Sequence, residues 1–344
     1  PTKPMPLSIP AVDDAEVWGD RGPDSAVPVP FTVAFPDEQI EDVRQRLRKT
    51  TSHGAKRLPG MHGSYGIEAS DLNPLLHRWK SAFDWRVHER HLNSIGLHSL
   101  IVDGLQVVFH HVRAPGRGSQ RRAILLLHGW PGSIFEFHPM IEKLSAHQQS
   151  GGAASGFDLV VPCLPGYGFS SAPVKEGYDT LAMARTFHRL MSRLGYDRFV
   201  VHGGDWGSVV ARLMGFYRPA PILGLHLNFF PVLPTPGYYV LEQLGVWLTD
   251  SDESRARAAV LRDLPTILGE TGYFHEQATC PETLGIALSD SPAGLAAWVL
   301  EKFDRWSSRK VRLSEKFDPD TLLANVMLYW LTGSITSSMG LYKE

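Results

Sequence analysis

The alternation of hydrophobic and polar positions divides the chain into three parts. In the central part, residues 123–227, short and continuously apolar runs alternate with longer segments that have helical spacing. Continuous apolar runs are typical of strands buried on both faces of a parallel sheet, and the helical segments supply the crossover connections. The pattern therefore predicts an α/β fold: a mostly parallel sheet with helices on both faces.

Four apolar runs supply the predicted strands of this sheet. They are residues 124–128, 158–162, 198–202 and 222–227. The predicted helices between them are residues 134–147 and 180–194. Ligands of parallel sheets bind outside the carboxyl ends of the strands. Side chains that follow residues 128 and 202 are therefore expected to meet at one end of the sheet.

The N-terminal part has a different pattern. Residues 1–30 are interrupted by prolines and show no periodicity, which predicts an extended arm. Residues 31–115 form a predicted N-terminal domain that begins with two helices, residues 36–49 and 71–83. The first helix starts with proline and acidic residues, as N-terminal turns do, and its apolar positions recur on one face. That face is expected to pack against the rest of the protein.

Two apolar runs, residues 97–102 and 105–112, flank an Asp-Gly dipeptide. Asp-Gly between apolar runs is a strong hairpin signal, so we expect the N-terminal domain to lead into the sheet through a β-hairpin. The second run contains the adjacent histidines His110 and His111. Neighbouring strand residues point to opposite faces, so this pair is not expected to form a metal site.

The strand signal ends near residue 230, which closes a predicted core domain of residues 116–230. From residue 231 to residue 344 the chain is rich in tryptophan, leucine and alanine at helical spacing. We interpret residues 231–344 as a helical cap above the sheet. Aromatic stripes on such helices more often form core than ligand contacts.

The composition of the 344-residue chain excludes several classes of protein. A net charge of −2 and a pI near 6.8 provide no basic surface for nucleic acid. Cys163 and Cys280 are too few and too far apart for a disulfide framework, which fits a reducing compartment. No apolar run reaches the roughly 18 residues of a membrane span, and the N-terminus lacks the layout of a signal peptide. We therefore expect a soluble, cytoplasmic protein.

Residues 203–207 (GGDWG) have the small-x-nucleophile-x-small pattern of a nucleophile elbow, with Asp205 at its centre. They lie between a predicted strand and a segment with helical spacing, which is the context that this strained turn requires. A carboxylate at this position attacks carbon electrophiles such as epoxides and alkyl halides, and leaves an ester that water can cleave. The alternative is an aspartate that only caps the following helix.

Several stretches together resemble the epoxide hydrolases of the α/β-hydrolase superfamily. They are residues 128–133 (HGWPGS), the elbow at 203–208 (GGDWGS), and the cap sequences 272–279, 290–298, 301–303, 329–333 and 342–344. The cap sequences are most similar to the microsomal-type branch, which carries an additional N-terminal epoxide hydrolase domain. The resemblance extends from about residue 31 to the last residue, and implies an α/β-hydrolase fold with a helical cap.

The resemblance implies that Asp205 is the nucleophile, and that Tyr273 and Tyr342 donate hydrogen bonds to the epoxide oxygen. Opening of the ring develops an alkoxide, and a phenol with a pKa of about 10 donates to it without ionising beforehand. The resemblance further implies that the substrate is a small apolar epoxide and that the product is a vicinal diol. The resemblance implies no cofactor and no metal ion.

The resemblance also implies that the backbone amides of Trp130 and Trp206 form an oxyanion hole for the hydrolysis of the ester. Trp130, Pro131 and Trp206 are expected to contact the substrate, because indoles beside the nucleophile exclude water and shape an apolar site. The alternative is that the two indoles only pack.

One part of the family's pattern has no counterpart before Glu344. The family completes its catalytic triad with an acid and a histidine that follow the cap, and a base must activate water for ester hydrolysis. After Asp205 the sequence contains only His226, within a predicted strand, and His275, two residues after Tyr273; we expect both to be structural. If the protein ends here, without the C-terminal end of the core, it is expected to form the ester, turn over poorly and expose an apolar sheet edge.

Two other functions are compatible with the sequence. A haloalkane dehalogenase also uses an elbow aspartate followed by tryptophan, but it does not need the Tyr273 and Tyr342 pair, and chloride release would identify it. A hydrolase-fold protein that binds an apolar epoxide-like ligand without turnover is supported by the missing histidine. The sequence leaves the physiological substrate and the oligomeric state open, a homodimer included.

Overall fold

The computed structural model describes residues 16–50, 65–114, 122–149, 156–230, 269–308 and 311–344. Its centre is a seven-stranded sheet of order β1-β2-β3-β5-β4-β6-β7. The strands are β1 (Val29–Phe31), β2 (Leu97–Val102), β3 (Leu105–Val112), β4 (Ala123–Leu127), β5 (Asp158–Pro162), β6 (Phe199–Gly203) and β7 (Ile222–Leu227). The sheet is mixed: β1, β2, β3 and β5 pair antiparallel, whereas β5, β4, β6 and β7 pair parallel.

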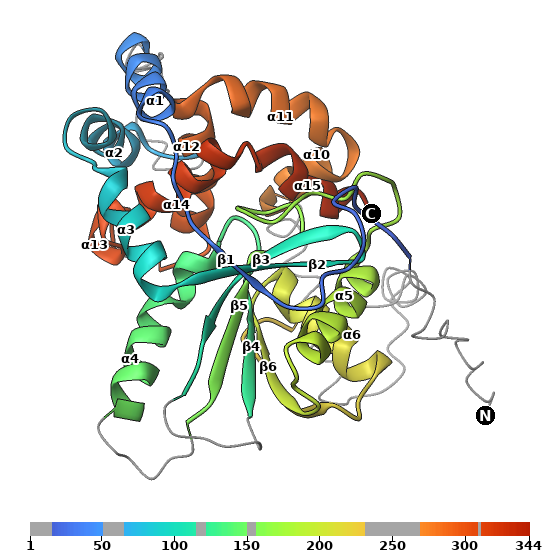
Figure 1. Ribbon diagram of the computed structural model, residues 1–344. Helices are drawn as coiled ribbons and strands as arrows, with labels where there is room; N and C mark the ends of the chain where they lie inside the picture. The colour runs from blue at the N-terminus through green and yellow to red at the C-terminus, as the bar shows by residue number, and fades with distance from the viewer. Residues whose placement is uncertain (1–15, 51–64, 115–121, 150–155, 231–268, 309–310) are drawn as a thin grey trace, which may run out of the picture.

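The helices lie on both faces of this sheet, which confirms the predicted α/β fold. Figure 1 shows α4 on one side of the strands and α5 and α6 on the other. The core helices are η1 (Ile134–Phe137), α4 (His138–Gln149), α5 (Thr180–Arg193) and α6 (Trp206–Tyr217). The predicted helix at 134–147 thus begins with a 3-10 turn, whose N-cap Ser133 accepts from the Phe135 amide at 3.3 Å.

The hairpin forms as predicted, with Val102 opposite Leu105 across the turn. Asp103 has a φ of 58° and Gly104 a φ of 74°, so both central residues adopt the positive φ of a type I′ turn. His110 and His111 point to opposite faces: His110 Nε2 lies 3.2 Å from His138 Nε2, whereas His111 Nε2 lies 2.8 Å from the Tyr196 hydroxyl. The rings of this pair therefore have separate partners.

Three helices precede the hairpin: α1 (Asp37–Lys49), α2 (Ala69–Ser81) and α3 (Trp85–Ile95). The second begins two residues before its predicted start, and residues 51–64, between the first two helices, lie outside the described residues. The sequence analysis missed α3. Its pattern is mostly polar, but Trp85 and Leu92 are fully buried, and Asp84 caps its N-terminus by accepting from the Arg86 amide at 2.9 Å.

The predicted N-terminal arm is described only from residue 16. Trp18 is buried, and its amide donates to the Asp103 carbonyl at 2.7 Å. The following residues lead to β1, which pairs with β2 at the edge of the sheet. This stretch therefore runs over the hairpin.

The C-terminal helices lie together beyond one end of the strands (Figure 1). They are α10 (Gly272–Thr279), α11 (Pro281–Asp290), α12 (Pro292–Arg305), α13 (Leu313–Lys316), α14 (Pro319–Thr332) and α15 (Ile335–Lys343). Two side chains of α14 fasten this layer to the loop after β4. Asn325 Nδ2 donates to the Pro131 carbonyl and the Tyr329 hydroxyl to the Gly132 carbonyl, both at 2.7 Å.

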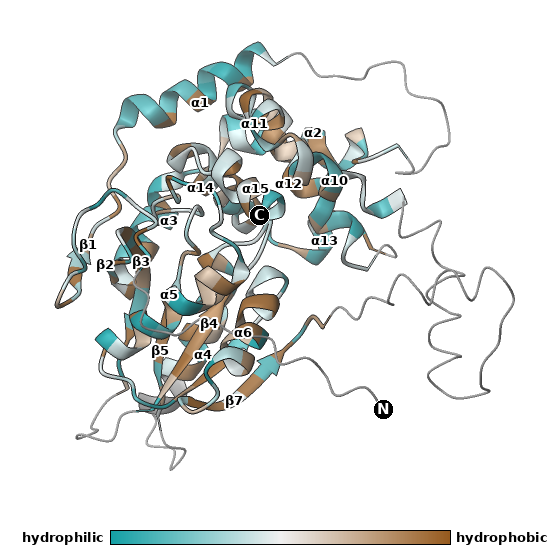
Figure 2. Ribbon diagram, turned by 90° about the vertical axis from the view of Figure 1, so that its right-hand side faces the viewer, coloured by the Kyte–Doolittle hydropathy of each residue, from teal (hydrophilic) through white to brown (hydrophobic). Residues whose placement is uncertain are grey.

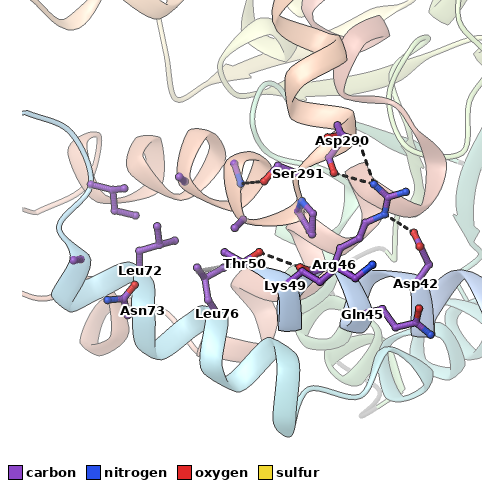
Figure 3. Close-up of a pocket in the computed structure, with 16 residues that line it drawn as sticks. Asp42, Gln45, Arg46, Lys49, Thr50, Leu72, Asn73, Leu76, Asp290 and Ser291 are labelled. Atoms are coloured by element: carbon purple, nitrogen blue, oxygen red, sulfur yellow. Dashed lines mark hydrogen bonds and ion pairs between the residues drawn. The ribbon is translucent and has the colours of Figure 1, made fainter. Parts of the chain in front are cut away.

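Ion pairs connect the N-terminal helices to the C-terminal layer. Arg78 of α2 forms a two-point contact with the Asp320 carboxylate, with both N–O distances at 2.6 Å. Arg46 of α1 donates to the Asp290 carbonyl at 3.0 Å, beside a pocket of about 750 Å³ between α1, α2 and α12 (Figure 3). These contacts join segments that are more than 240 residues apart.

Strand β7 is the edge of the described sheet (Figure 2). Its side chains Leu223 and Leu225 are 39% and 43% exposed, unlike the buried leucines of β4. Among the described residues no single helix is long and apolar enough to cross a membrane; α11 and α12 together meet the criteria of length and composition, but they are bent by 118°.

Candidate active site

Asp205 lies on a sharp turn between β6 and α6, as the elbow pattern predicts. Its φ is 50° and its ψ is −125°, a backbone conformation that is strained for any residue with a side chain. The side chain makes no capping hydrogen bond to α6. The alternative interpretation of Asp205 as a helix-capping aspartate therefore lacks the contact that would support it.

The glycines of the elbow allow α6 to pass close to the sheet. A Cβ atom on Gly203 would lie 2.1 Å from the Gly207 carbonyl oxygen, and one on Gly207 would lie 2.1 Å from the Leu127 carbonyl oxygen of β4. Both neighbours are backbone atoms, which cannot rotate away. Each glycine is therefore required by the close packing of strand, turn and helix.

Replacement of Gly207 by alanine is expected to lower the free energy of unfolding by about 3 kcal/mol, because α6 must separate from β4 to accommodate the methyl group. Urea unfolding measures this loss. Gly215→Ala in the same helix is the control, because its new Cβ would meet only the end of the Leu225 side chain. That change should alter stability by less than about 1 kcal/mol. Equal stability of the two variants would show that the close approach of Gly207 to the β4 backbone does not limit stability.

The Asp205 carboxylate faces the loop after β4. The Trp130 amide donates to its Oδ1 atom at 2.8 Å, and a Cβ atom on Gly129 would lie 2.2 Å from the same oxygen. Desolvation raises the pKa of Asp205 to about 6, although hydrogen bonds from the backbone of Trp206 and Trp130 lower it. The carboxylate is therefore partly buried, hydrogen-bonded by two amides and ionised at neutral pH.

Tyr273 of α10 and Tyr342 of α15 lie over this turn. Their ring centroids are 6.0 Å apart, and their hydroxyl groups are hydrogen-bonded to each other. The Tyr273 ring is stacked on the Trp130 indole at 5.6 Å, and the Tyr342 ring meets the Trp206 indole edge to face at 4.9 Å. Residues from four separate segments thus form one aromatic cluster beside Asp205.

Burial raises the pKa of both phenols, and the nearby Asp205 carboxylate raises it further. The pKa of Tyr273 reaches about 12, and that of Tyr342 is also well above its usual value. The side chain of Trp206 is hydrogen-bonded to Tyr342. Both phenols therefore remain protonated at neutral pH and can donate hydrogen bonds to an oxygen between them.

A second carboxylate, that of Glu136, lies next to Asp205 and was not predicted from the sequence. Burial raises the pKa of Glu136 to about 8, and the Asp205 charge raises it further, against a hydrogen bond from the Gly129 backbone. A Cβ atom on Gly132 would lie 2.6 Å from its Oε1 atom. Solvent reaches more than a third of the Glu136 surface, and this exposure screens part of the upward shift of its pKa. In the sequence, Ser133 and Glu136 have the Ser-x-x-Glu spacing of a capping box. This pattern predicts the start of a helix and does not indicate a carboxylate beside Asp205.

The buried Tyr167, which follows β5, is the other residue that was missed. It is 1% exposed, its hydroxyl group lacks a partner among the described residues, and the Asp205 carboxylate contributes to the raised pKa of its phenol. Its signal in the sequence was a Gly-Tyr-Gly loop at the carboxyl end of a strand, the end at which sites form.

The two histidines that follow Asp205 in the sequence have other contacts. His226 lies on β7, and its Nδ1 atom is 2.7 Å from Nδ1 of His202 on β6. His275 lies on α10 with its ring next to Phe274. The pocket of Figure 3 is also separate, since none of the predicted site residues lines it. The loop after β4, the elbow and the two tyrosines therefore define the candidate site.

Comparison with known proteins identifies the family. The family model for the epoxide hydrolase N terminus matches residues 28–137, and that for the alpha/beta hydrolase fold matches residues 122–228. Epoxide hydrolase 1 of Sus scrofa is 38% identical over 92% of this chain and 72% of its own length. Juvenile hormone epoxide hydrolase of Bombyx mori is 34% identical over 98% of this chain and 76% of its own length.

Solved structures agree with these relatives. The crystal structure of the Bombyx mori juvenile hormone epoxide hydrolase superposes with a TM-score of 0.79 at 32% identity, over 96% of this chain and 80% of that one. The Aspergillus niger epoxide hydrolase gives a TM-score of 0.76 at 31% identity, over 96% and 81%. This chain therefore belongs to the epoxide hydrolase family and has the α/β-hydrolase fold.

Proposed function

We propose that the protein hydrolyses an apolar epoxide to a vicinal diol through a covalent ester on Asp205. The observation that carries the proposal is the arrangement of an ionised carboxylate on a strained elbow beneath two protonated phenols. A nucleophile and hydrogen-bond donors on either side of one small space are what ring opening requires.

In the first step, a carboxylate oxygen of Asp205 attacks one carbon of the epoxide. A carbon–oxygen bond of the ring breaks, and its electron pair moves to the epoxide oxygen. Tyr273 and Tyr342 donate hydrogen bonds to that oxygen, and one phenol supplies the proton that converts it to a hydroxyl group. The negative charge thus moves from the carboxylate at the elbow toward the phenols of the cap.

In the second step, water attacks the carbonyl carbon of the Asp205 ester. The oxyanion that develops there is stabilised by the amides of Trp130 and Trp206, which already contact the carboxylate. Each donor of this kind is typically worth about 3 kcal/mol. The acyl–oxygen bond of the ester then breaks: the diol oxygen takes one proton of the attacking water, the other proton returns to the phenolate left by the first step, and the Asp205 carboxylate is regenerated.

The substrate we propose is apolar, because the surroundings of the two phenols are aromatic. Tyr342 contacts the rings of Trp130, Trp206 and Phe274 at centroid distances of 5.9, 4.9 and 5.2 Å. We also propose Pro131, which follows Trp130 in the same loop, as a contact to the substrate. Walls of this composition exclude water and favour an apolar or aryl group next to the ring.

Intact-mass spectrometry with styrene oxide tests the proposal. If the ester is stable, we expect a covalent adduct that maps to Asp205. If the ester is hydrolysed, we expect the diol as product and ¹⁸O from labelled water in the protein. During a single turnover in ¹⁸O water, the label should enter the Asp205 carboxylate rather than the diol, because water attacks the ester carbonyl. Absence of both adduct and labelled Asp205 across several epoxides would refute the proposal, and chloride release from a haloalkane would replace it with dehalogenation.

The rate of adduct formation is expected to depend on pH through Asp205. Because the pKa of its carboxyl group is about 6, the nucleophile is ionised above that pH, and the rate should fall about tenfold per pH unit below it. Glu136, whose pKa is about 8, stays protonated below pH 6, where the rate is expected to fall. Stopped single-turnover samples from pH 4.5 to 8 measure the profile. A rate that is constant down to pH 4.5 would contradict this assignment.

A further inference from the structure

The cap contains a buried lysine whose ammonium group lies on the ring of Tyr273. Lys302 of α12 is 7% exposed, and its Nζ atom lies 4.6 Å from the centroid of the Tyr273 ring. Trp298 and Trp306 enclose the same ammonium group, each with its ring centroid 5.7 Å away. The only carboxylate paired with it among the described residues is Glu301, at 2.5 Å. Three aromatic rings and one carboxylate thus form the surroundings of this charge.

Burial of an ammonium group is costly, and a salt bridge alone is weak compensation. Glu301 also pairs with Arg305, at 3.1 Å, and Arg305 in turn forms a two-point contact with Glu270 at 2.8 and 2.5 Å. Besides Glu301, the neighbours of the ammonium group in the described part of the chain are the three aromatic rings. The electron-rich faces of the rings attract it, with more effect where water is excluded.

We infer that Lys302 positions and polarises Tyr273, and thereby strengthens the hydrogen bond that Tyr273 donates to the epoxide oxygen. This inference rests on the proposed function. The ring of Tyr273 contacts the Trp130 indole at an interplanar angle of 8° as well as the ammonium group, so its orientation over Asp205 is fixed by two neighbours. Lys302 acts through Tyr273 and does not touch the substrate.

The interaction between Lys302 and Tyr273 is expected to be stronger in the transition state than before the reaction. The neutral phenol interacts with the ammonium group only through its ring quadrupole. When the epoxide opens, negative charge accumulates on the oxygen that Tyr273 holds, and the interaction with Lys302 becomes one between opposite charges. Only interactions that strengthen in the transition state accelerate the reaction. Burial and the Asp205 charge raise the pKa of Tyr273 to about 12, which makes its phenol a weaker acid. The positive charge of Lys302 opposes this weakening.

Replacement of Lys302 by glutamine tests the inference, because glutamine removes the charge but can still donate a hydrogen bond to Glu301. We expect the rate constant of ester formation at saturating styrene oxide to fall about tenfold with little change in the half-saturating epoxide concentration. Lys302→Arg should remain within about threefold of the unchanged protein, since it retains the charge. Lys302→Met provides the same test if the glutamine variant does not fold.

Lys316→Gln is the matched control. Lys316 is equally buried on the same cap and pairs with Asp304 at 2.8 Å, but it has no ring contact among the described residues. This variant should form the ester at the unchanged rate. A comparable loss in Lys316→Gln would show that any buried cap lysine matters through packing, and would overturn the inference.

The decisive measurement combines Lys302→Gln with Tyr273→Phe. A residue that acts through the Tyr273 hydroxyl has nothing to polarise once the hydroxyl is gone, so Lys302→Gln should slow the Tyr273→Phe protein by less than about twofold. A tenfold loss in both backgrounds would assign Lys302 to the packing of the cap and overturn the inference alone. If the unchanged protein forms no ester and shows no labelled Asp205, the proposed function fails, and the inference fails with it.

Discussion

An Asp205→Asn protein is expected to form no ester with styrene oxide and yet to be more stable than the unchanged protein at pH 8. The amide is not a nucleophile, so we expect the rate of adduct formation to fall by at least about 10⁴-fold. The gain in stability has a separate origin. The carboxyl group has a pKa of about 6 in the folded protein, against 3.8 for an ordinary aspartate, so folding favours its neutral form.

The sign of this effect can be followed through the pH range. Well below pH 3.8 the carboxyl group is protonated in both states and contributes no penalty. As the pH rises to 6, the unfolded chain loses its proton first, and the folded protein becomes relatively less stable. Above pH 6 the penalty is constant, at up to about 3 kcal/mol for two pKa units and less to the extent that solvent reaches Asp205. Asparagine removes this penalty.

Urea unfolding at pH 4 and pH 8, together with mass spectrometry, checks both parts of the prediction. Asp179→Asn is the control, because Asp179 accepts from the Leu181 and Ala182 amides at 2.9 and 2.8 Å as an exposed N-cap, and asparagine caps helices equally well. Its adduct formation should be unchanged. An adduct on the Asp205→Asn protein would place the nucleophile elsewhere, and Glu136, whose pKa the Asp205 charge raises, would be the first carboxylate to test.

Removal of both cap hydroxyl groups is the second prediction of large effect. Tyr273→Phe and Tyr342→Phe should each slow ester formation about 10-fold to 100-fold, and the double variant about 10³-fold or more. Each single variant leaves one donor for the developing alkoxide, whereas the double variant leaves none. The two effects are not expected to add, because the hydroxyl groups are hydrogen-bonded to each other.

Ester formation in a single turnover with styrene oxide measures these losses. Tyr178→Phe is the matched control: this buried hydroxyl group donates to Thr186 at 3.1 Å, so its loss should cost about 1 kcal/mol of stability and leave the rate unchanged. Double-variant activity equal to that of the unchanged protein would remove the phenols from the reaction. Such a result would favour a dehalogenase-like mechanism, which needs no donor to an epoxide oxygen.

The sequence by itself determined the features that depend on short stretches of chain. The hairpin of β2 and β3 follows from Asp-Gly between two apolar runs, and both residues have the positive φ that this dipeptide permits. The strand-turn-helix at Asp205 follows from glycines that only a close backbone approach requires. The parallel strands follow from continuous apolar runs. In each case the sequence signal lies within about ten residues.

The resemblance to a known family added Tyr273 and Tyr342 of the cap to the predicted site, but it did not predict the residues that surround them. Nothing local in the sequence of α12 distinguishes Lys302 from a solvent-exposed lysine, and Glu136 has the pattern of a capping box. The helix α3 was missed because its residues are mostly polar, although the ring of Trp85 is fully buried. These features depend on which faces of distant elements pack together.

The tertiary structure alone decided the surroundings of the reacting groups. It stacks Tyr273 of α10 on Trp130 of the loop after β4, places Lys302 of α12 on the Tyr273 ring, and sets Glu136 beside Asp205. The pKa values of Asp205, Glu136 and Tyr273 depend on burial, and those of Glu136 and Tyr273 also on the Asp205 charge from a segment far away in sequence. Periodicity and turn chemistry specify the elements, whereas desolvation and through-space charge, which determine reactivity, exist only once the elements have packed.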